Sequence, residues 1–344
     1  MRLPFLWCVG LIFGLAPPIY DSSAAAPKNP AVTENFYGVQ IVGEKAWIVG
    51  YYGTILYSAD RGLTWEIQNS PVRSALFSVR FVDPAKGWVS GSHGALLHTV
   101  DGGKNWRIQS TDTTDHLFGS FWLGETHGWI VGSRGATLRT DDAGRSWHEF
   151  TVPGDFTFSS VSFANQTRGW IAGEFGVIFQ TRDGGKSWQK QKSPVEVSIA
   201  SGESRNLFAL QFTAPEKGWA FGLDGLILQT RDGNRWEIVR QRTDANSAAG
   251  GANHLFAAAA SNNRLWAVGE RGTLLKSDLD GNVWRQANSA IPRLSLNAIA
   301  FGNDGIGLAV GNRGIILRTE DHGATWKRLK LTGQSGAKDS TRAP

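Results

Sequence analysis

The chain is short of the residues that build most small chemical sites. Its 344 residues include one cysteine, Cys8, and one methionine, Met1. A single cysteine excludes a disulfide scaffold and a cysteine-rich zinc site. The seven histidines show no metal-ligand spacing, and charged residues make up only 19% of the chain. We therefore expect no metal and no cofactor, and a fold held together by its packed core.

Long apolar runs are also missing, except at the N-terminus. Leu3 to Ala16 is apolar, follows Arg2 and precedes the small residues Ser22 to Ala26. The run is shorter than the roughly 20 residues that span a bilayer. Residues 1–26 are therefore predicted to be a signal peptide cleaved near Ala26, with a retained anchor as the alternative. Either way the chain is expected to be exported, to the periplasm in a bacterium.

The chain is rich in glycine and tryptophan, with 42 and 15 residues, and these recur at fixed spacing. The string GWIVGSRGATLRTDDAGRSW (128–147) has relatives at six other places, and the first four copies recur every 41 residues. Such self-similarity is typical of repeat architectures. One tryptophan column is Trp47, Trp88, Trp129, Trp170, Trp219 and Trp266, with Leu308 in seventh place. The second column is Trp65, Trp106, Trp147, Trp188, Trp236, Trp284 and Trp326.

Each repeat predicts four short strands. In the second repeat LFSVRFV, WVSGS, ALLHT and WRIQS are separated by DPAKG, HG and VDGGKN. Strands of this length between Gly, Asp and Pro turns are typical of all-β proteins, and seven such sheets cover their faces when they are arranged radially. We predict an all-β fold, a seven-bladed β-propeller of four-stranded antiparallel blades over residues 34–331, with a flexible tail over 332–344.

Two details of the propeller follow from the same pattern. The ring is expected to close by side-chain packing, because the first repeat begins with its first strand and the last ends with its fourth. Small side chains are expected where the first strands converge, although the sixth repeat leaves its register ambiguous. In the other six repeats these residues are Gly38, Ser78, Gly119, Ser160, Ala209 and Ala298.

An Asp-rich turn precedes most tryptophans of the second column. Aspartate and hydroxyl side chains accept backbone N–H bonds in turns, and glycine adopts the positive φ that a reversal needs. We interpret this turn as a structural Asp-box, with one carboxylate where a calcium loop has several. The fifth copy, TRDGNRW, is one residue short, and the sixth, SDLDGNVW, displaces its aspartate. The predicted Asp-box aspartates are Asp60, Asp101, Asp142, Asp183, Asp232 and Asp321.

The GW, GxxG and Asp-box elements at fixed offsets resemble the photosystem II stability/assembly factor family. The resemblance covers residues 34–331 and implies a single propeller of the thylakoid lumen or bacterial periplasm. In photosynthetic members that propeller helps to assemble the reaction centre and binds the D1 subunit. The resemblance implies an exported protein that binds a subunit of a membrane complex, and we expect a non-enzymatic monomer. The sequence identifies neither the source organism nor the partner.

A secreted glycan-binding or glycan-cleaving propeller is the alternative, because sialidases and xyloglucanases also carry Asp-boxes. A sialidase needs a tyrosine nucleophile, a glutamate and three arginines. After the signal peptide the only tyrosines are Tyr37, Tyr51, Tyr52 and Tyr57, all in the first repeat. Xyloglucanases that resemble the repeat use two propellers. We predict no catalytic residue, and the export signal argues against nucleic acid as a partner.

Arginines and insertions gather in the turns that a propeller places on one face. These turns are the GxxG turns and the blade-to-blade loops, which also hold the insertions Val195 to Asn206 and Arg242 to Asn253. Variable loops on a rigid scaffold often carry function, and guanidinium groups suit carboxylates. An acidic protein partner is therefore predicted, with scattered solubilising charge as the alternative; the resemblance adds an arginine-rich patch. The predicted partner-binding residues are Arg73, Arg134, Arg205, Arg271, Arg293 and Arg313.

Overall fold

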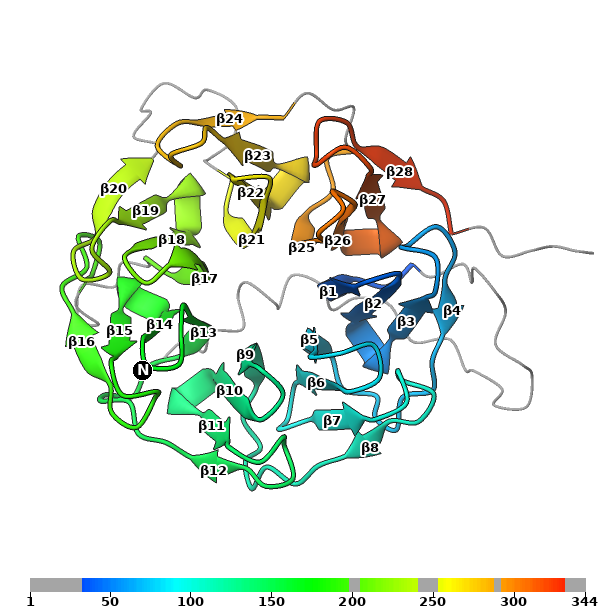
Figure 1. The fold of residues 1–344 in the computed structure, drawn as a ribbon, viewed down its shortest axis with the longest axis horizontal. Helices are drawn as coiled ribbons and strands as arrows, with labels where there is room; N and C mark the ends of the chain where they lie inside the picture. The colour runs from blue at the N-terminus through cyan, green and yellow to red at the C-terminus, as the bar shows by residue number, and fades with distance from the viewer. Residues whose placement is uncertain (1–32, 198–204, 241–252, 288–291, 332–344) are drawn as a thin grey trace, which may run out of the picture.

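A computed structural model describes residues 33–197, 205–240, 253–287 and 292–331. These residues form seven four-stranded sheets around one axis, and within each sheet every strand pairs antiparallel with the next along the chain (Figure 1). The predicted seven-bladed propeller is confirmed. The predicted signal peptide (1–26), the tail (332–344) and most of both insertions lie outside the described residues.

The first strand of each blade is innermost and the fourth is outermost (Figure 1). Blade 1 is β1 (Phe36–Val42), β2 (Lys45–Gly50), β3 (Ile55–Ser58) and β4 (Glu66–Ile67). Blade 2 is β5 (Leu76–Phe81), β6 (Gly87–Gly91), β7 (Leu96–Thr99) and β8 (Arg107–Ile108). Blade 3 is β9 (Leu117–Leu123), β10 (His127–Gly132), β11 (Thr137–Thr140) and β12 (His148–Glu149). Blade 4 is β13 (Phe158–Phe163), β14 (Gly169–Gly173), β15 (Ile178–Thr181) and β16 (Gln189–Gln191).

The remaining blades follow the same order around the ring. Blade 5 is β17 (Leu207–Ala214), β18 (Lys217–Gly222), β19 (Ile227–Thr230) and β20 (Glu237–Arg240). Blade 6 is β21 (Leu255–Ser261), β22 (Arg264–Gly269), β23 (Leu274–Ser277) and β24 (Trp284–Gln286). Blade 7 is β25 (Leu296–Phe301), β26 (Gly307–Gly311), β27 (Ile316–Thr319) and β28 (Lys327–Leu329). No helix among the described residues is long and apolar enough to cross a membrane.

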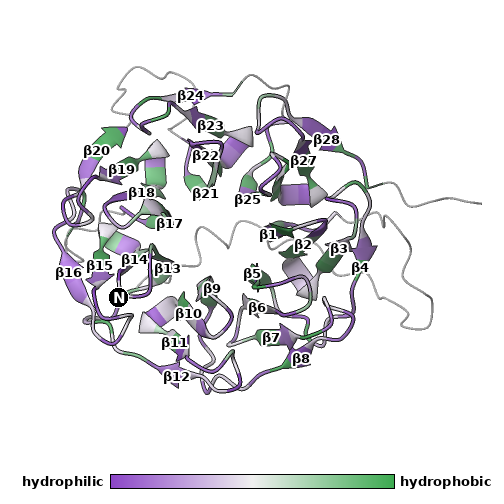
Figure 2. Cartoon of the chain, in the orientation of Figure 1, coloured by the Kyte–Doolittle hydropathy of each residue, from purple (hydrophilic) through white to green (hydrophobic). Residues whose placement is uncertain are grey.

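Hydropathy decreases from the inner strands to the outer edge of each blade. Most second strands are buried along nearly their whole length, as in β6, whereas both residues of β8 are exposed. The inner strands are correspondingly hydrophobic and the outermost strands and loops mostly hydrophilic (Figure 2). Each blade therefore packs both faces against its neighbours, and the core is a ring of interfaces between blades.

The first tryptophan column links each blade to the next. Three of these indole N–H groups donate to the carbonyl oxygen of the Asp-box glycine in the following blade, at 3.0 to 3.2 Å. At Gly185, Gly233 and Gly281 the glycine is also required for space, because an added Cβ would lie 3.0 Å or less from the indole of the preceding blade. A Cβ on Gly185, for example, would lie 2.5 Å from Nε1 of Trp129. The three bonded pairs are Trp47–Gly102, Trp170–Gly233 and Trp219–Gly281.

The Asp-box turns form a network of hydrogen bonds within each outer hairpin. In blade 2 the Thr99 hydroxyl donates to Asp101 at 2.8 Å and accepts from the Gly103 N–H at 2.9 Å. Asp101 also accepts from both the backbone and the side chain of Asn105. Four further boxes repeat the pattern around Asp60, Asp142, Asp183 and Asp321.

The two irregular boxes adapt in different ways. In the shortened box of blade 5, Asp232 accepts from the N–H groups of Asn234 and Arg235, which are two and three residues on. In blade 6, Asp278 accepts from the Asn282 N–H at 2.9 Å. Asp278 was absent from the predicted set, because its position relative to Trp284 differs from that in the regular repeats.

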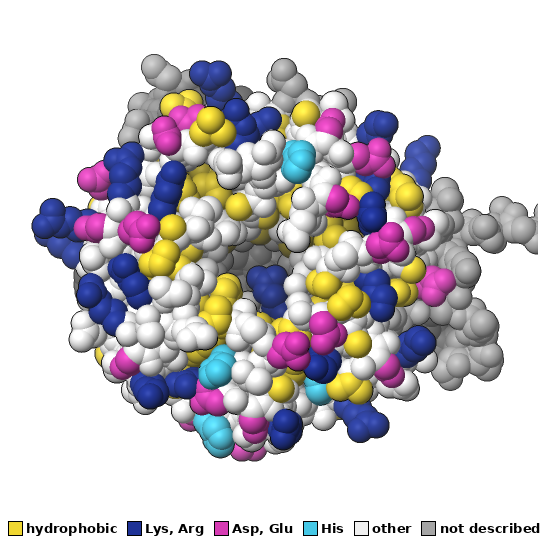
Figure 3. Space-filling view, viewed as in Figure 1, with side chains coloured by type: hydrophobic (Ala, Val, Ile, Leu, Met, Phe, Trp, Pro, Cys, Tyr) yellow, Lys and Arg dark blue, Asp and Glu magenta, His cyan; other side chains and the backbone are white. Residues whose placement is uncertain are grey.

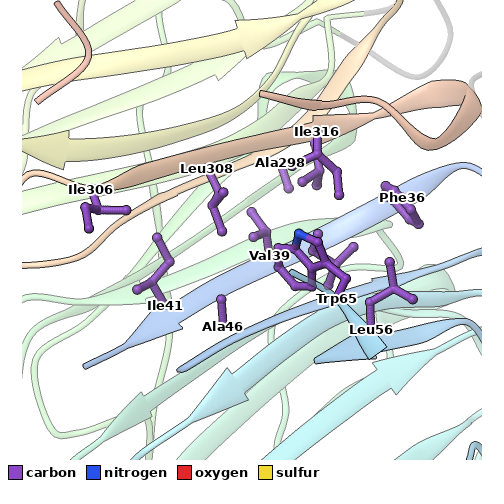
Figure 4. Close-up of a cluster of buried hydrophobic side chains, with 12 residues drawn as sticks. Phe36, Val39, Ile41, Ala46, Leu56, Trp65, Ala298, Ile306, Leu308 and Ile316 are labelled. Carbon is purple, nitrogen blue, oxygen red and sulfur yellow. The ribbon is translucent and has the colours of Figure 1, made fainter. Parts of the chain in front are cut away.

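The ring closes between blades 7 and 1 without a shared strand, which confirms the expected closure. Val39 and Ile41 of β1 pack with Ala298, Ile306 and Leu308 of blade 7 in one apolar cluster (Figure 4). The bond from the Asn297 side chain to the Phe36 carbonyl oxygen, at 2.8 Å, adds a polar link.

Candidate partner-binding face

The GxxG turns and the blade-to-blade loops meet at one end of the ring. The second glycine of each GxxG in blades 1 to 3 donates its N–H to a carbonyl in the loop that leads to the next blade. Six of the turns are single 3-10 turns. These are η3 (Tyr51–Gly53), η4 (Ser133–Gly135), η5 (Glu174–Gly176), η7 (Leu223–Gly225), η8 (Glu270–Gly272) and η9 (Asn312–Gly314). We call this end of the ring the arginine face.

Three arginines occupy the middle of these turns in a strained backbone conformation. Arg134, Arg271 and Arg313 have φ of 52°, 52° and 56°. The left-handed region is unfavourable for a residue with a Cβ, and the surrounding turn has to hold it in place. All three side chains are exposed, so the turns present them to solvent at the outermost point of the face.

Four arginines of the face have no carboxylate partner among the described residues. All four are exposed, and Arg73 stacks over the ring of Tyr52 at 5.7 Å. They follow one another around the ring, from η8 of blade 6, through the loop to blade 7 and η9, to the loop after blade 1. We call this set the open arginine sector: Arg73, Arg271, Arg293 and Arg313.

The other two predicted arginines differ from this sector. Nη2 of Arg134 lies 2.5 Å from a carboxylate oxygen of Asp115, whose side chain is only 19% exposed. That ion pair compensates the Arg134 charge. Arg205 is half-buried and makes a further contact of its own. The three arginines of the GxxG turns thus share a backbone conformation. Only Arg134 has its charge paired with a carboxylate among the described residues.

Two acidic side chains of the GxxG turns accept backbone N–H bonds, whereas Asp224 of η7 is exposed. Glu174 accepts from the Thr157 N–H at 2.8 Å, and Glu270 accepts from the His254 N–H at 3.3 Å. Burial lowers the pKa of His116, so that histidine is neutral at pH 7 and adds no positive charge. The open arginine sector is therefore a set of basic groups on the face that has no carboxylate partner among the described residues.

The described residues include no cluster of metal ligands and no carboxylate whose pKa is raised. They contain no cluster of three or more His, Asp or Glu that could hold a metal. A glycosidase acid needs a raised pKa. Every carboxylate with a shifted pKa in the described part of the chain has it lowered, mostly by turn hydrogen bonds. These groups are Asp60, Asp83, Asp101, Asp142, Asp183, Asp232, Asp278, Glu320 and Asp321.

Solved structures with the same fold include YCF48 proteins and a GH74 enzyme. A structure described as YCF48 bound to D1 peptide has a TM-score of 0.67 at 21% identity, over 88% of this chain and 99% of that one. YCF48 from Cyanidioschyzon merolae gives 0.64 at 21% identity, over 86% and 99%. An ancestral GH74 enzyme gives 0.69 at 13% identity, over 90% of this chain and 48% of that one. At these identities the likeness establishes the fold alone.

The sequence comparisons identify a family. No curated protein matches the chain. The profile of the family described as photosynthesis system II assembly factor YCF48 matches residues 36–98, 62–151, 120–195 and 253–338. These segments together cover more than half of the chain and include strands of all blades except blade 5. The chain therefore belongs to the photosynthesis system II assembly factor YCF48 family.

Proposed function

We propose that this propeller is an exported, non-enzymatic monomer that binds an acidic, extended segment of a membrane protein or assembling complex. The observation that carries the proposal is the open arginine sector, four exposed guanidinium groups without carboxylate partners among the described residues. A cluster of this kind steers an acidic partner and speeds its capture. The D1 peptide bound to the solved YCF48 structure supports a peptide ligand. The location is the periplasm, or the thylakoid lumen in a photosynthetic source.

Charge reversal in the sector tests the proposal. The sector variant is Arg271→Glu, Arg293→Glu and Arg313→Glu. Its matched control is Arg107→Glu, Arg285→Glu and Arg328→Glu, which makes the same charge change on exposed residues of the outermost strands. Tagged wild-type and variant proteins are incubated with detergent-solubilised membranes from the source organism, and captured proteins are identified by mass spectrometry.

The wild type and the control are expected to capture the same membrane protein, and the sector variant to lose most of it. Capture by the wild type should weaken with salt, because the screening length falls from about 10 Å at 0.1 M to about 3 Å at 1 M. Undiminished capture by the sector variant would overturn the assignment of the site. Turnover of xyloglucan or a sialoside by the wild type would overturn the non-enzymatic assignment.

A further inference from the structure

The innermost strands around the central axis carry a single charged side chain. The innermost strands β1, β5, β9, β13, β17, β21 and β25 contain no Asp, Glu or Lys, and one arginine, Arg80. The space-filling view shows a hollow at the centre of the ring, with a basic side chain inside it (Figure 3). An isolated cation on an otherwise uncharged wall is unfavourable unless an anion compensates it.

The Arg80 guanidinium is only partly satisfied by the protein. Its Nε donates to the Ser120 carbonyl oxygen of the next blade at 3.1 Å, and Nη1 lies 3.5 Å from the Val79 carbonyl oxygen. Arginine has five N–H donors, so three are left for another acceptor. No carboxylate among the described residues pairs with Arg80. Burial lowers the pKa of the guanidinium, which stays charged at pH 7.

The same position in blade 1 shows that a link between blades does not need this charge. Gln40 pairs with Trp47 in the ladder as Arg80 pairs with Trp88. Its side-chain amide donates to the Phe81 carbonyl oxygen at 3.0 Å and accepts from the Phe81 N–H. A neutral amide therefore joins blade 1 to blade 2. The positive charge of Arg80 is left without a structural role.

A ring of aromatic side chains surrounds the channel mouth at the arginine face. In all seven innermost strands the second residue is skipped by the ladder in a β-bulge, and its side chain is half-buried. Ser159 and Asn297 hold two of these positions. Aromatic residues hold the other five, and neighbouring rings lie 5.3 to 5.7 Å apart in three pairs. We call these five the aromatic collar: Tyr37, Phe77, Phe118, Phe208 and Phe256.

The collar is additional to the packing between blades. The residue before each collar position is Phe36, Leu76, Leu117, Leu207 or Leu255, and every one of these side chains is fully buried. Those residues already fill the interface at this level of the strand. Half-exposed rings gathered at one mouth are a feature of binding sites more than of cores.

The spacing between Phe77 and Arg80 along β5 sets the length of a peptide that can contact both the aromatic collar and the guanidinium. Arg80 lies three residues beyond Phe77, about 10 Å deeper along an extended strand. An extended peptide has nearly the same rise, so an apolar side chain in the collar would lie three residues before the group at Arg80. If the acidic group is the C-terminus of the peptide, only one stretch of backbone has to run through the collar. If it is an internal side chain, the backbone has to enter and leave through the same mouth.

We propose that the central channel binds the free C-terminal carboxylate of an extended peptide, with the carboxylate at Arg80 and an apolar side chain three residues earlier in the aromatic collar. The channel opens at the arginine face, so a partner segment held there can end in it. The site is nevertheless separate from the open arginine sector, and the two can be tested independently.

The test uses the full chain and one defined probe. The probe is an N-acetylated octapeptide of glycine and serine, with one leucine three residues before the last and a free carboxylate. Its controls are the same peptide with a C-terminal amide, and the amide with one glutamate in mid-chain. Binding is measured by isothermal titration with the wild type, Arg80→Gln, Phe77→Ser and the sector variant; melting temperatures check the fold of each.

The wild type is expected to bind the free acid about tenfold more tightly than either amide, the preference that one charge-assisted contact gives. Arg80→Gln should remove that preference, and Phe77→Ser should weaken all three peptides. The sector variant should keep the preference, which separates this proposal from the proposed function. Equal binding of acid and amide by the wild type, or a preference that survives Arg80→Gln, would overturn the proposal.

Discussion

The Asp-box aspartate is the residue on which each outer hairpin depends. In blade 2 the hydrogen bonds from the side chain and the backbone of Asn105 lower the pKa of Asp101 to about 2. The unfolded value is near 3.9. A lowered pKa in the folded state means that the ionised carboxylate stabilises the fold above about pH 4. That contribution is lost as the pH falls through the folded pKa.

Asp101→Ala is therefore expected to lower the free energy of unfolding by about 1 kcal/mol at pH 7, a typical value for a lost turn acceptor. The difference between wild type and variant should shrink as the pH falls from about 4 towards 2. Urea denaturation across this range measures it. A difference that is the same at pH 6 and at pH 2.5 would show that the carboxylate charge has no part in the stabilisation.

The sequence did not predict which individual arginines have their charge paired with a carboxylate. The GxxG pattern placed Arg134, Arg271 and Arg313 at equivalent turns, and the backbone agrees. Only the structure shows that Asp115, from the preceding blade-to-blade loop, neutralises Arg134. Such a pairing depends on how two neighbouring loops approach each other, and the repeat pattern does not specify that approach.

The outer hairpin of each blade packs against the first-column residue of the preceding blade. Gly185 has a φ of 83°, and its Cα faces the indole of Trp129. By contrast Gly43, in the turn between β1 and β2, has a φ of 60°, and a Cβ added there would meet nothing within 4 Å. The two glycines share the left-handed backbone, and they differ in the space around them.

Gly43→Ala is expected to cost about 1 kcal/mol, the strain of a positive φ alone. Gly185→Ala should cost about 2–4 kcal/mol, because the new methyl group also displaces the Trp129 ring. Denaturant titration of both variants measures the difference, and the tryptophan fluorescence of the folded state should change only in the second. Equal losses would show that backbone conformation alone fixes this glycine.

Elements built from the repeat pattern were predicted well, and irregular ones were not. The strands, the turns and the small residues of the innermost strands follow from alternation and spacing. The ladder also resolves the ambiguous sixth repeat, where Ala257 is the small residue that follows the bulge. The aromatic collar escaped prediction because a bulge inserts one residue without changing the composition of the strand. A strict alternation pattern assigns that residue to the buried face.

At the scale of the whole molecule, one of the seven blade interfaces differs from the others. Six neighbouring pairs are joined by a loop of the chain, which limits how far the two blades can separate. Blades 7 and 1 have no such connection, because the chain enters the ring at β1 and leaves it after β28. Leu308 replaces the first-column tryptophan here and packs against Gly62 of blade 1. Leucine has no side-chain N–H to donate, so the closing interface lacks the indole hydrogen bond that three of the other interfaces have.

Leu308→Ala tests this closure against Leu228→Ala, a matched change in the cluster between blades 4 and 5. Both side chains are fully buried, so each variant should lose about 2–5 kcal/mol. Only Leu308→Ala should open the ring below the global unfolding transition, since no loop holds blades 7 and 1 together. Hydrogen exchange read by mass spectrometry should then show faster exchange in β1 and β25 for that variant. If Leu228→Ala produced equally fast local exchange at its own interface, the missing covalent connection would not be what makes the closure weak.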